Sequence, residues 1–129
     1  KTPGICVIND DARSICDQVA RCERLMVVSR LMLGCYALPM KRMLERLLPN
    51  QQPFIRIRAG ETHHVQRNVR PKQAIIIGYG DLSEEEKDIF RQLVARNANN
   101  MSFASWRVVF VPEEEVEQAV QSEVQSWEK

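Results

Sequence analysis

The sequence predicts an α/β fold in which a parallel sheet carries helices on both faces. Short apolar runs at 25–29 and 73–77 are typical of strands buried on both faces, and a third strand is expected at 106–111. Segments with apolar residues at helical spacing precede, separate and follow these strands. Strands that alternate with helices along a chain form parallel sheets with the helices packed against them.

Length and composition favour one globular domain covering residues 1–129. Of the residues, 44% are hydrophobic and 27% are charged, so a packed core is expected rather than disorder. The 18 basic and 17 acidic residues nearly cancel, which gives no electrostatic case for binding nucleic acid or a membrane. The sequence has no apolar run near the roughly 20 residues of a membrane span and no signal peptide. We therefore expect a cytoplasmic protein.

The first half of the chain contains two expected helices. Asn9, Asp10 and Asp11 suit the N-terminal cap of a helix over about 11–21. A second helix begins near Pro39 and is ended by Pro49. Its polar positions, which include Lys41 and Arg46, are expected to form a solvated face. The apolar positions that define the two helices are Ile15, Val19 and Cys22, and Met40, Met43, Leu44, Leu47 and Leu48.

The second half begins with an irregular insertion at about 50–72, which is long for a connection inside a compact domain. The second strand-to-helix connection, after the strand at 73–77, holds Ser83 and Glu86, a spacing that predicts a capping box. That helix is expected to stop in the asparagine cluster at 97–100, and a last helix follows Pro112. The chain contains four cysteines with no C-x-x-C pair, so buried, reduced thiols are expected.

The candidate site lies where the parallel strands end, because ligands of open parallel sheets bind beyond the carboxyl ends of the strands. The connection SRLMLGCYA is unusually apolar for a loop, and glycines there and in GYGD permit close backbone approach to a flat ligand. Cover by a neighbouring subunit or by the 50–72 insertion explains the apolar loop equally well. The candidate binding residues are Ser29, Arg30, Leu31, Met32, Leu33, Gly34, Cys35, Tyr36, Gly78, Tyr79, Gly80 and Asp81.

Four stretches together resemble the flavodoxin-like family of NAD(P)H-dependent FMN reductases, within the branch that has a cysteine-containing N-terminal segment. The stretches are PGICVINDD, SRLMLGCYALPMKRMLERLLP, AGETHH and AIIIGYGDLSEEEKDIF. The resemblance as a whole covers nearly the whole chain. The resemblance implies a three-layer flavodoxin-like sandwich with five parallel strands in the order 2-1-3-4-5. The first two strands, and the loop that holds the FMN phosphate, would then lie upstream of Lys1.

The same resemblance implies a function for the candidate residues. Residues 29–36 and 78–81 would flank the isoalloxazine ring, and NAD(P)H as co-substrate would pass hydride to it for delivery to an electron acceptor. Because the cofactor carries this chemistry, no catalytic side chain is expected. The family usually begins the first loop with Thr/Ser-Pro-Val-Tyr, whereas this chain has Ser29-Arg30-Leu31-Met32. Arg30 is then free to reach a phosphate or a carboxylate.

Two functions therefore follow from the sequence. The first is an FMN-dependent oxidoreductase that forms a homodimer. The alternative is a cofactor-free relative that acts as a protein-interaction or dimerisation module, which the missing phosphate loop favours. Glu61, His63 and His64 are expected at the mouth of the site or across a dimer interface, and a metal site is disfavoured because adjacent histidines on an extended segment point to opposite faces.

Overall fold

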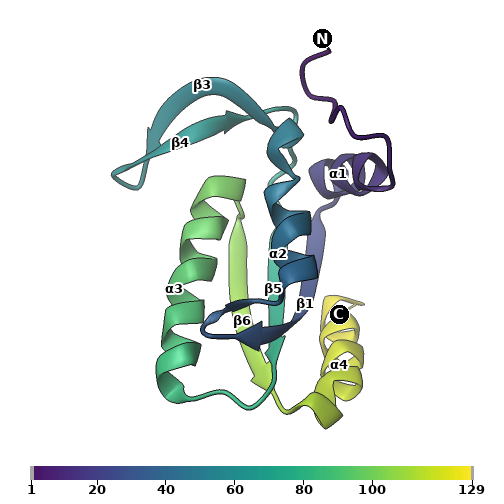
Figure 1. Ribbon diagram of the computed structural model, residues 1–129, viewed down its shortest axis with the longest axis vertical. Helices are drawn as coiled ribbons and strands as arrows, with labels where there is room; N and C mark the ends of the chain where they lie inside the picture. Colours follow the sequence, from purple (N-terminus) through teal and green to yellow (C-terminus); the bar gives the residue numbers. More distant parts are fainter. Residues whose placement is uncertain (1, 129) are drawn as a thin grey trace.

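The computed structural model describes residues 2–128 and shows a four-stranded sheet between helices (Figure 1). The α-helices lie close to their expected positions, and two short 3-10 turns, η1 and η2, adjoin them. In chain order the elements are α1 (Ala12–Arg21), β1 (Arg24–Met32), β2 (Cys35–Tyr36), α2 (Leu38–Glu45), η1 (Leu48–Asn50), β3 (Gln51–Arg58), β4 (Glu61–Gln66), β5 (Gln73–Tyr79), α3 (Glu84–Met101), β6 (Ser105–Val111), η2 (Glu113–Glu115) and α4 (Val116–Glu128).

The sheet has the strand order β2-β1-β5-β6. The three strands expected from the sequence are confirmed as parallel neighbours, with β5 between β1 and β6. The short β2 pairs antiparallel with the end of β1, so the sheet is mixed rather than wholly parallel. The structure is thus an α/β arrangement compatible with a three-layer fold.

The apolar connection SRLMLGCYA is not a loop, which corrects the sequence expectation. Strand β1 continues to Met32, and a two-residue turn at Leu33 and Gly34 leads directly into β2. Both turn residues have positive φ angles, 51° and 70°, as a type I′ hairpin turn requires. The backbone polar groups of this segment are therefore paired within a hairpin, which explains why apolar side chains are tolerated there.

The main core lies between one face of the sheet and α3. Phe90 and Val94 of α3 are fully buried against Ala74 and Ile76 of β5. Because successive strand residues point to opposite faces, Ile75 and Ile77 face the other side, where α4 packs (Figure 1). Burying each such side chain contributes roughly 1.5–3 kcal/mol to folding. Helices therefore cover both faces, as the alternation of elements predicted.

The segment at 50–72 is not irregular. It contains a separate two-stranded sheet, β3 and β4, joined by a second type I′ turn at Ala59 and Gly60. Arg58 donates to the carbonyl oxygens of Asn99 and Phe103, both at 3.4 Å, which ties this hairpin to the end of α3. Such anchoring matters because an isolated two-stranded hairpin is marginally stable in water.

Two helix starts use side-chain caps. Ser83 and Glu86 form the expected capping box at α3, with Ser83 Oγ accepting from the Glu86 N–H at 3.2 Å and the Glu86 carboxylate accepting from the Ser83 N–H at 3.0 Å. At α1 the backbone cap position is Asp11, but Asp10 supplies the side-chain bond, accepting from the Ala12 N–H at 3.2 Å. Asp10 therefore supplies the side-chain cap of α1, although Asp11, the next residue, occupies the backbone cap position.

Candidate functional site

A cavity of about 500 Å³ lies at the carboxyl ends of the three parallel strands, and we call it the carboxyl-edge cavity. The parallel register brings its walls together, because β1, β5 and β6 all end at this edge of the sheet. Three of the candidate residues predicted from sequence line it. The lining residues are Arg30, Gly80, Asp81, Leu82, Lys87, Phe110, Val111, Pro112, Glu113 and Glu114.

Gly80 lines this cavity, and a Cβ at this position would make ordinary contacts without a clash. Its φ angle of 133° is one that L side chains rarely adopt, and a Cβ built there would have no heavy atom closer than 3.7 Å. Gly78, in contrast, sits directly under Leu31, whose Cδ1 would lie 2.5 Å from an added Cβ. Of the three glycines expected to permit close approach of a ligand, Gly78 and Gly34 are packed against side chains, since a Cβ at Gly34 would lie 2.6 Å from Ile89 Cγ2, and only Gly80 is uncrowded.

The remaining predicted residues separate into buried and exposed groups. Ser29, Leu31 and Tyr36 are buried, and Tyr36 stacks edge-on against Phe90 with ring centroids 4.8 Å apart. Burial also raises the pKa of the Tyr36 hydroxyl above its ordinary value. These side chains therefore belong to the core. Gly34 is buried as well. Cys35, Tyr79 and Gly80 are half-buried, whereas Arg30, Met32, Leu33 and Asp81 are exposed.

Met32 and Leu33 give the carboxyl edge an exposed apolar corner. Leu33 is 87% exposed and also occupies a left-handed backbone conformation that costs a non-glycine residue free energy. The exposure of the leucine side chain does not stabilise the fold, and asparagine or glycine would adopt this turn conformation at lower cost. An exposed leucine in strained backbone is the kind of outlier from which a binding role is inferred.

The two cations that line the carboxyl-edge cavity, Arg30 and Lys87, both form ion pairs with glutamates. Arg30 and Glu113 form an ion pair at 3.2 Å, and both side chains are more than half exposed. Lys87 is paired with Glu84 at 2.6 Å. Exposed pairs of this kind contribute little to stability, so a ligand can displace them at small cost. Arg30 is thus available to an anionic or carbonyl group on a ligand.

The cavity suits a flat ring better than a phosphate. Phosphate sites use converging backbone N–H groups at a helix N-terminus. Within residues 2–128, the two helical segments that begin at this edge carry glutamates in their first turns, at 84–86 and 113–115. Those carboxylates repel a phosphate dianion. The residues present therefore do not fit the phosphate of FMN.

Glu61, His63 and His64 lie on the β3–β4 hairpin, at the other end of the sheet from the carboxyl-edge cavity (Figure 1). The two histidines point to opposite faces, as expected for neighbours on a strand. His63 contacts the Glu61 carboxylate at 3.0 Å, and Glu61 also accepts from Asn99 Nδ2 at 3.2 Å. His64 Nδ1 lies 2.9 Å from the Gln52 carbonyl oxygen. A position at the mouth of the carboxyl-edge cavity is therefore wrong, and an interface role stays a prediction.

A second cavity, of about 540 Å³, lies between the β3–β4 hairpin, α2 and α3, and we call it the hairpin cavity. Cys35 and Tyr36, expected at the ring site, line this cavity instead. Most of its wall is apolar, and its polar lining residues include several amides and two lysines. The lining residues are Val19, Cys35, Tyr36, Lys41, Leu44, Glu45, Leu47, Leu48, Asn50, Gln51, Gln66, Val69, Lys72, Leu93, Asn97, Asn100, Met101 and Phe103.

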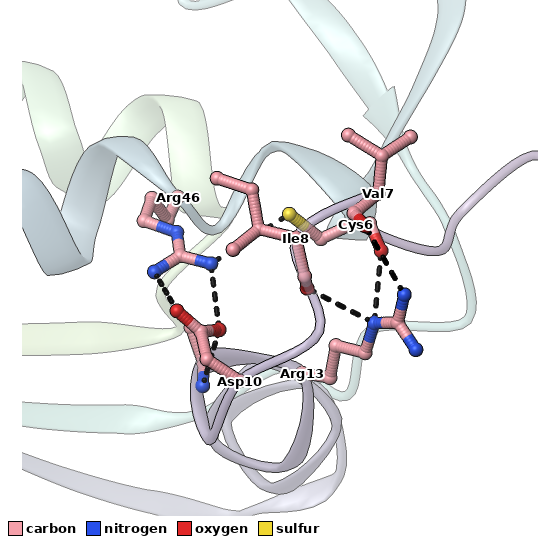
Figure 2. Close-up of polar contacts among 7 residues, drawn as sticks. Cys6, Val7, Ile8, Asp10, Arg13 and Arg46 are labelled. Carbon is pink, nitrogen blue, oxygen red and sulfur yellow. Dashed lines mark hydrogen bonds and ion pairs between the residues drawn. The ribbon is translucent and has the colours of Figure 1, made fainter.

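A polar cluster holds the segment before α1 in place, and Figure 2 shows its members. The Arg46 guanidinium donates to both Asp10 carboxylate oxygens at 2.7 Å and lies 3.7 Å from Cys6 Sγ. The Arg13 guanidinium donates to the carbonyl oxygens of Cys6 at 2.9 Å and Ile8 at 3.1 Å. The segment before α1 is therefore held by Arg13 of α1 and by Arg46, which directly follows α2.

The cluster changes the properties of its acidic groups. The hydrogen bond from Arg46 lowers the pKa of the Cys6 thiol and the pKa of the Asp10 carboxyl below their ordinary values. Arg46 is therefore not part of a solvated face, as the helical pattern had suggested, whereas Lys41 is paired with Glu45 on the exposed side of α2. The thiols are free, as expected, but among the four only Cys16 is buried.

Sequence reasoning missed Cys6, Arg13 and Arg46 as a group, because the partners lie up to 40 positions apart. It also missed Lys72, which is buried. The only sequence feature that indicated burial of Lys72 was its position directly before the buried strand β5.

Comparisons of the chain with protein-family models, curated proteins and solved structures find no match. Within residues 2–128 there is no helix long and apolar enough to cross a membrane. In the same part of the chain, no three histidine, cysteine, aspartate or glutamate side chains gather where they could hold a metal ion.

Proposed function

We propose that this chain is a flavodoxin-like, FMN-dependent NAD(P)H oxidoreductase domain in which the carboxyl-edge cavity takes the flat ring of the flavin. The observation that carries the proposal is the convergence of the β1 and β5 ends on one cavity, which Arg30 and Gly80 both line. Open parallel sheets bind ligands at this edge. The predicted motifs around Gly34 and Gly80 both belong to elements that end there.

The apolar corner supports the same ligand class. Met32 is 61% exposed and Leu33 is 87% exposed, at the edge where the parallel strands end. Apolar side chains next to an adaptable arginine suit a planar heteroaromatic ring, which needs apolar contact on its faces and a polar partner at its rim. The nicotinamide of NAD(P)H belongs to the same chemical class, so the proposed co-substrate needs no separate kind of surface.

Comparing riboflavin with FMN tests the proposal, because the two differ only in the phosphate. A site that holds the ring without a built phosphate cradle binds both, with dissociation constants within about threefold of each other, equivalent to less than about 0.7 kcal/mol. Quenching of flavin fluorescence on titration with the protein gives both constants. Absence of quenching by either flavin at millimolar protein would contradict the proposal.

Two glycine variants locate the ring. Gly80→Ala adds a methyl group to the wall of the carboxyl-edge cavity and is expected to weaken riboflavin binding about tenfold, or about 1.4 kcal/mol. Gly60→Ala is the matched control, because Gly60 also has a positive φ angle but lies in the distant β3–β4 turn with open space around it. Equal weakening in both variants would mean that backbone strain, not occupancy of the cavity, caused the loss.

The alternative function, a cofactor-free dimerisation module, is favoured by one different observation. Ile55 and Ile57 lie on the outer face of the β3–β4 hairpin and are 63% and 80% exposed. Exposed apolar side chains that share a face are typical of interaction surfaces. Sedimentation that reports a dimer in wild-type protein and a monomer in Ile57→Thr, with no flavin binding in either, would favour this function over the oxidoreductase.

A further inference from the structure

Lys72 is a buried lysine with an unusual set of contacts. It is 2% exposed, and its Nζ donates to the Arg70 carbonyl oxygen at 2.9 Å. The structure describes two other lysines, Lys41 and Lys87, and both form ion pairs with glutamates. Within residues 2–128, Lys72 has no such carboxylate partner. An ammonium group held this way loses its hydration without gaining an opposite charge.

The hairpin cavity lies beside this lysine. Its volume of about 540 Å³ is ample for a small organic molecule, and its wall is mainly apolar. The titratable groups that share the wall are Cys35, Tyr36, Lys41 and Glu45, and the Lys41–Glu45 pair is exposed on α2. A ligand in this cavity therefore meets apolar side chains, amides and a lysine with two remaining hydrogen-bonding positions.

Burial also separates Lys72 chemically from Lys41. Desolvation lowers the pKa of the Lys72 ammonium, while the nearby Cys22 thiol opposes this lowering. The bond to Glu45 raises the pKa of Lys41 instead. At neutral pH the neutral amine, which is the nucleophilic form, is therefore more populated at Lys72 than at Lys41.

We infer that Lys72 is a reactive amine and that the hairpin cavity binds apolar aldehydes or ketones, which Lys72 captures reversibly as an imine. The inference rests on two observations. The Lys72 amine is buried without a carboxylate partner, and Lys72 lies at the wall of a largely apolar cavity. The inference concerns a different site from the carboxyl-edge cavity, and it stands whether or not that cavity binds a flavin.

The capture reaction is balanced without any further reactant. The nitrogen lone pair of Lys72 adds to the carbonyl carbon, and the electron pair of the C=O π bond moves to the oxygen. The nitrogen then loses both of its protons as the oxygen leaves as water, and a C=N double bond remains. The reverse reaction with water releases the ligand. No electron is gained or lost by either partner.

The test uses 4-hydroxybenzaldehyde as the probe and cyanoborohydride as the trapping reductant, which converts the imine to a stable secondary amine. Native protein is treated at neutral pH, and peptide mass mapping reports the label on each lysine. We expect several-fold more label on Lys72 than on Lys41, because the lowered pKa of Lys72 leaves more of its amine in the neutral, nucleophilic form. In concentrated urea the same two lysines are expected to label equally.

Two variants complete the experiment. Lys72→Met removes the amine while keeping an apolar chain in the buried position, and it is expected to abolish the preferred label with the circular dichroism spectrum unchanged. Leu44→Phe narrows the hairpin cavity at another wall and is expected to reduce native labelling of Lys72 several-fold. Labelling of Lys72 no faster than Lys41 in native protein, or labelling that Leu44→Phe leaves unchanged, would overturn the inference.

Discussion

At the scale of single residues, Leu33 in the β1–β2 turn tests the proposed binding site. Its side chain is exposed, and its φ angle of 51° is unfavourable for leucine. Leu33→Asn, which tolerates this conformation, is expected to raise the free energy of unfolding by about 0.5–1 kcal/mol. If Leu33 contacts the ligand, the same change weakens riboflavin binding. Urea unfolding and a flavin titration measure the two effects.

Ala59→Asn is the control for Leu33→Asn, because Ala59 occupies the first position of the other type I′ turn with a φ angle of 52°. Both variants relieve the same kind of backbone strain. Only the change at Leu33 is expected to alter flavin binding, since Ala59 lies on the distant hairpin. A change in stability without any change in binding at Leu33 would remove that residue from the proposed site.

Cys6 provides a pH-dependent prediction. Because Arg46 stabilises the thiolate, the folded-state pKa of Cys6 lies below that of the unfolded chain. The stabilisation is therefore present above the unfolded pKa and is lost as pH falls through the folded value. Alkylation by iodoacetamide is expected to start at lower pH for Cys6 than for the buried Cys16, whose pKa is raised by burial.

Arg46→Gln checks the cause of this shift. The variant removes the cation beside the Cys6 thiol, so the alkylation profile of Cys6 is expected to move to higher pH. The profile of Cys16 serves as the internal reference, because its thiol bonds to Asn50 rather than to Arg46. An unchanged Cys6 profile in this variant would show that Arg46 does not activate the thiol.

At the scale of elements, β1 has one paired side and one largely open side. The Arg30 carbonyl oxygen accepts a hydrogen bond from the Ala37 N–H at 2.9 Å, on the side of β2. Strand alternation then places the N–H groups of Met26 and Val28 on that same side, where no strand of the described chain pairs with them. The N–H groups of Val27 and Ser29 face β5.

Amide hydrogen exchange is expected to follow this alternation. Met26 and Val28 should exchange faster than Val27 and Ser29, although all four belong to one strand. Residues 75–77 of β5, which has a strand on each side, provide the slow-exchanging reference. Uniform protection along β1 would mean that another segment or a second copy of the chain covers this edge in solution.

At the scale of the whole molecule, the sheet and helices were predictable because their signals are local. Buried parallel strands appear as continuous apolar runs, and β5 carries three consecutive isoleucines. The capping box at Ser83 is likewise a short-range pattern. The two hairpins were missed because their turns, Leu33-Gly34 and Ala59-Gly60, place a residue other than asparagine or aspartate at the first position.

The candidate site was predictable only in part. The rule for strand ends correctly brought Arg30, Gly80 and Asp81 to one cavity. It failed for Leu31 and Tyr36, which are cross-strand partners in the hairpin and share the face that packs into the core. Lys72 was missed for a different reason. Its cavity is assembled from distant segments, and such long-range packing leaves no periodic trace in the sequence.

The central claim is that the carboxyl-edge cavity takes a flat heteroaromatic ring, and mapping riboflavin by backbone amide chemical shifts tests it most directly. The account predicts that the largest shifts fall on Arg30, Leu33, Gly80 and Asp81, with the β3–β4 hairpin unaffected. Shifts concentrated instead around the hairpin cavity, at residues such as Leu44, Asn97 and Lys72, or no saturable shifts at all, would contradict it.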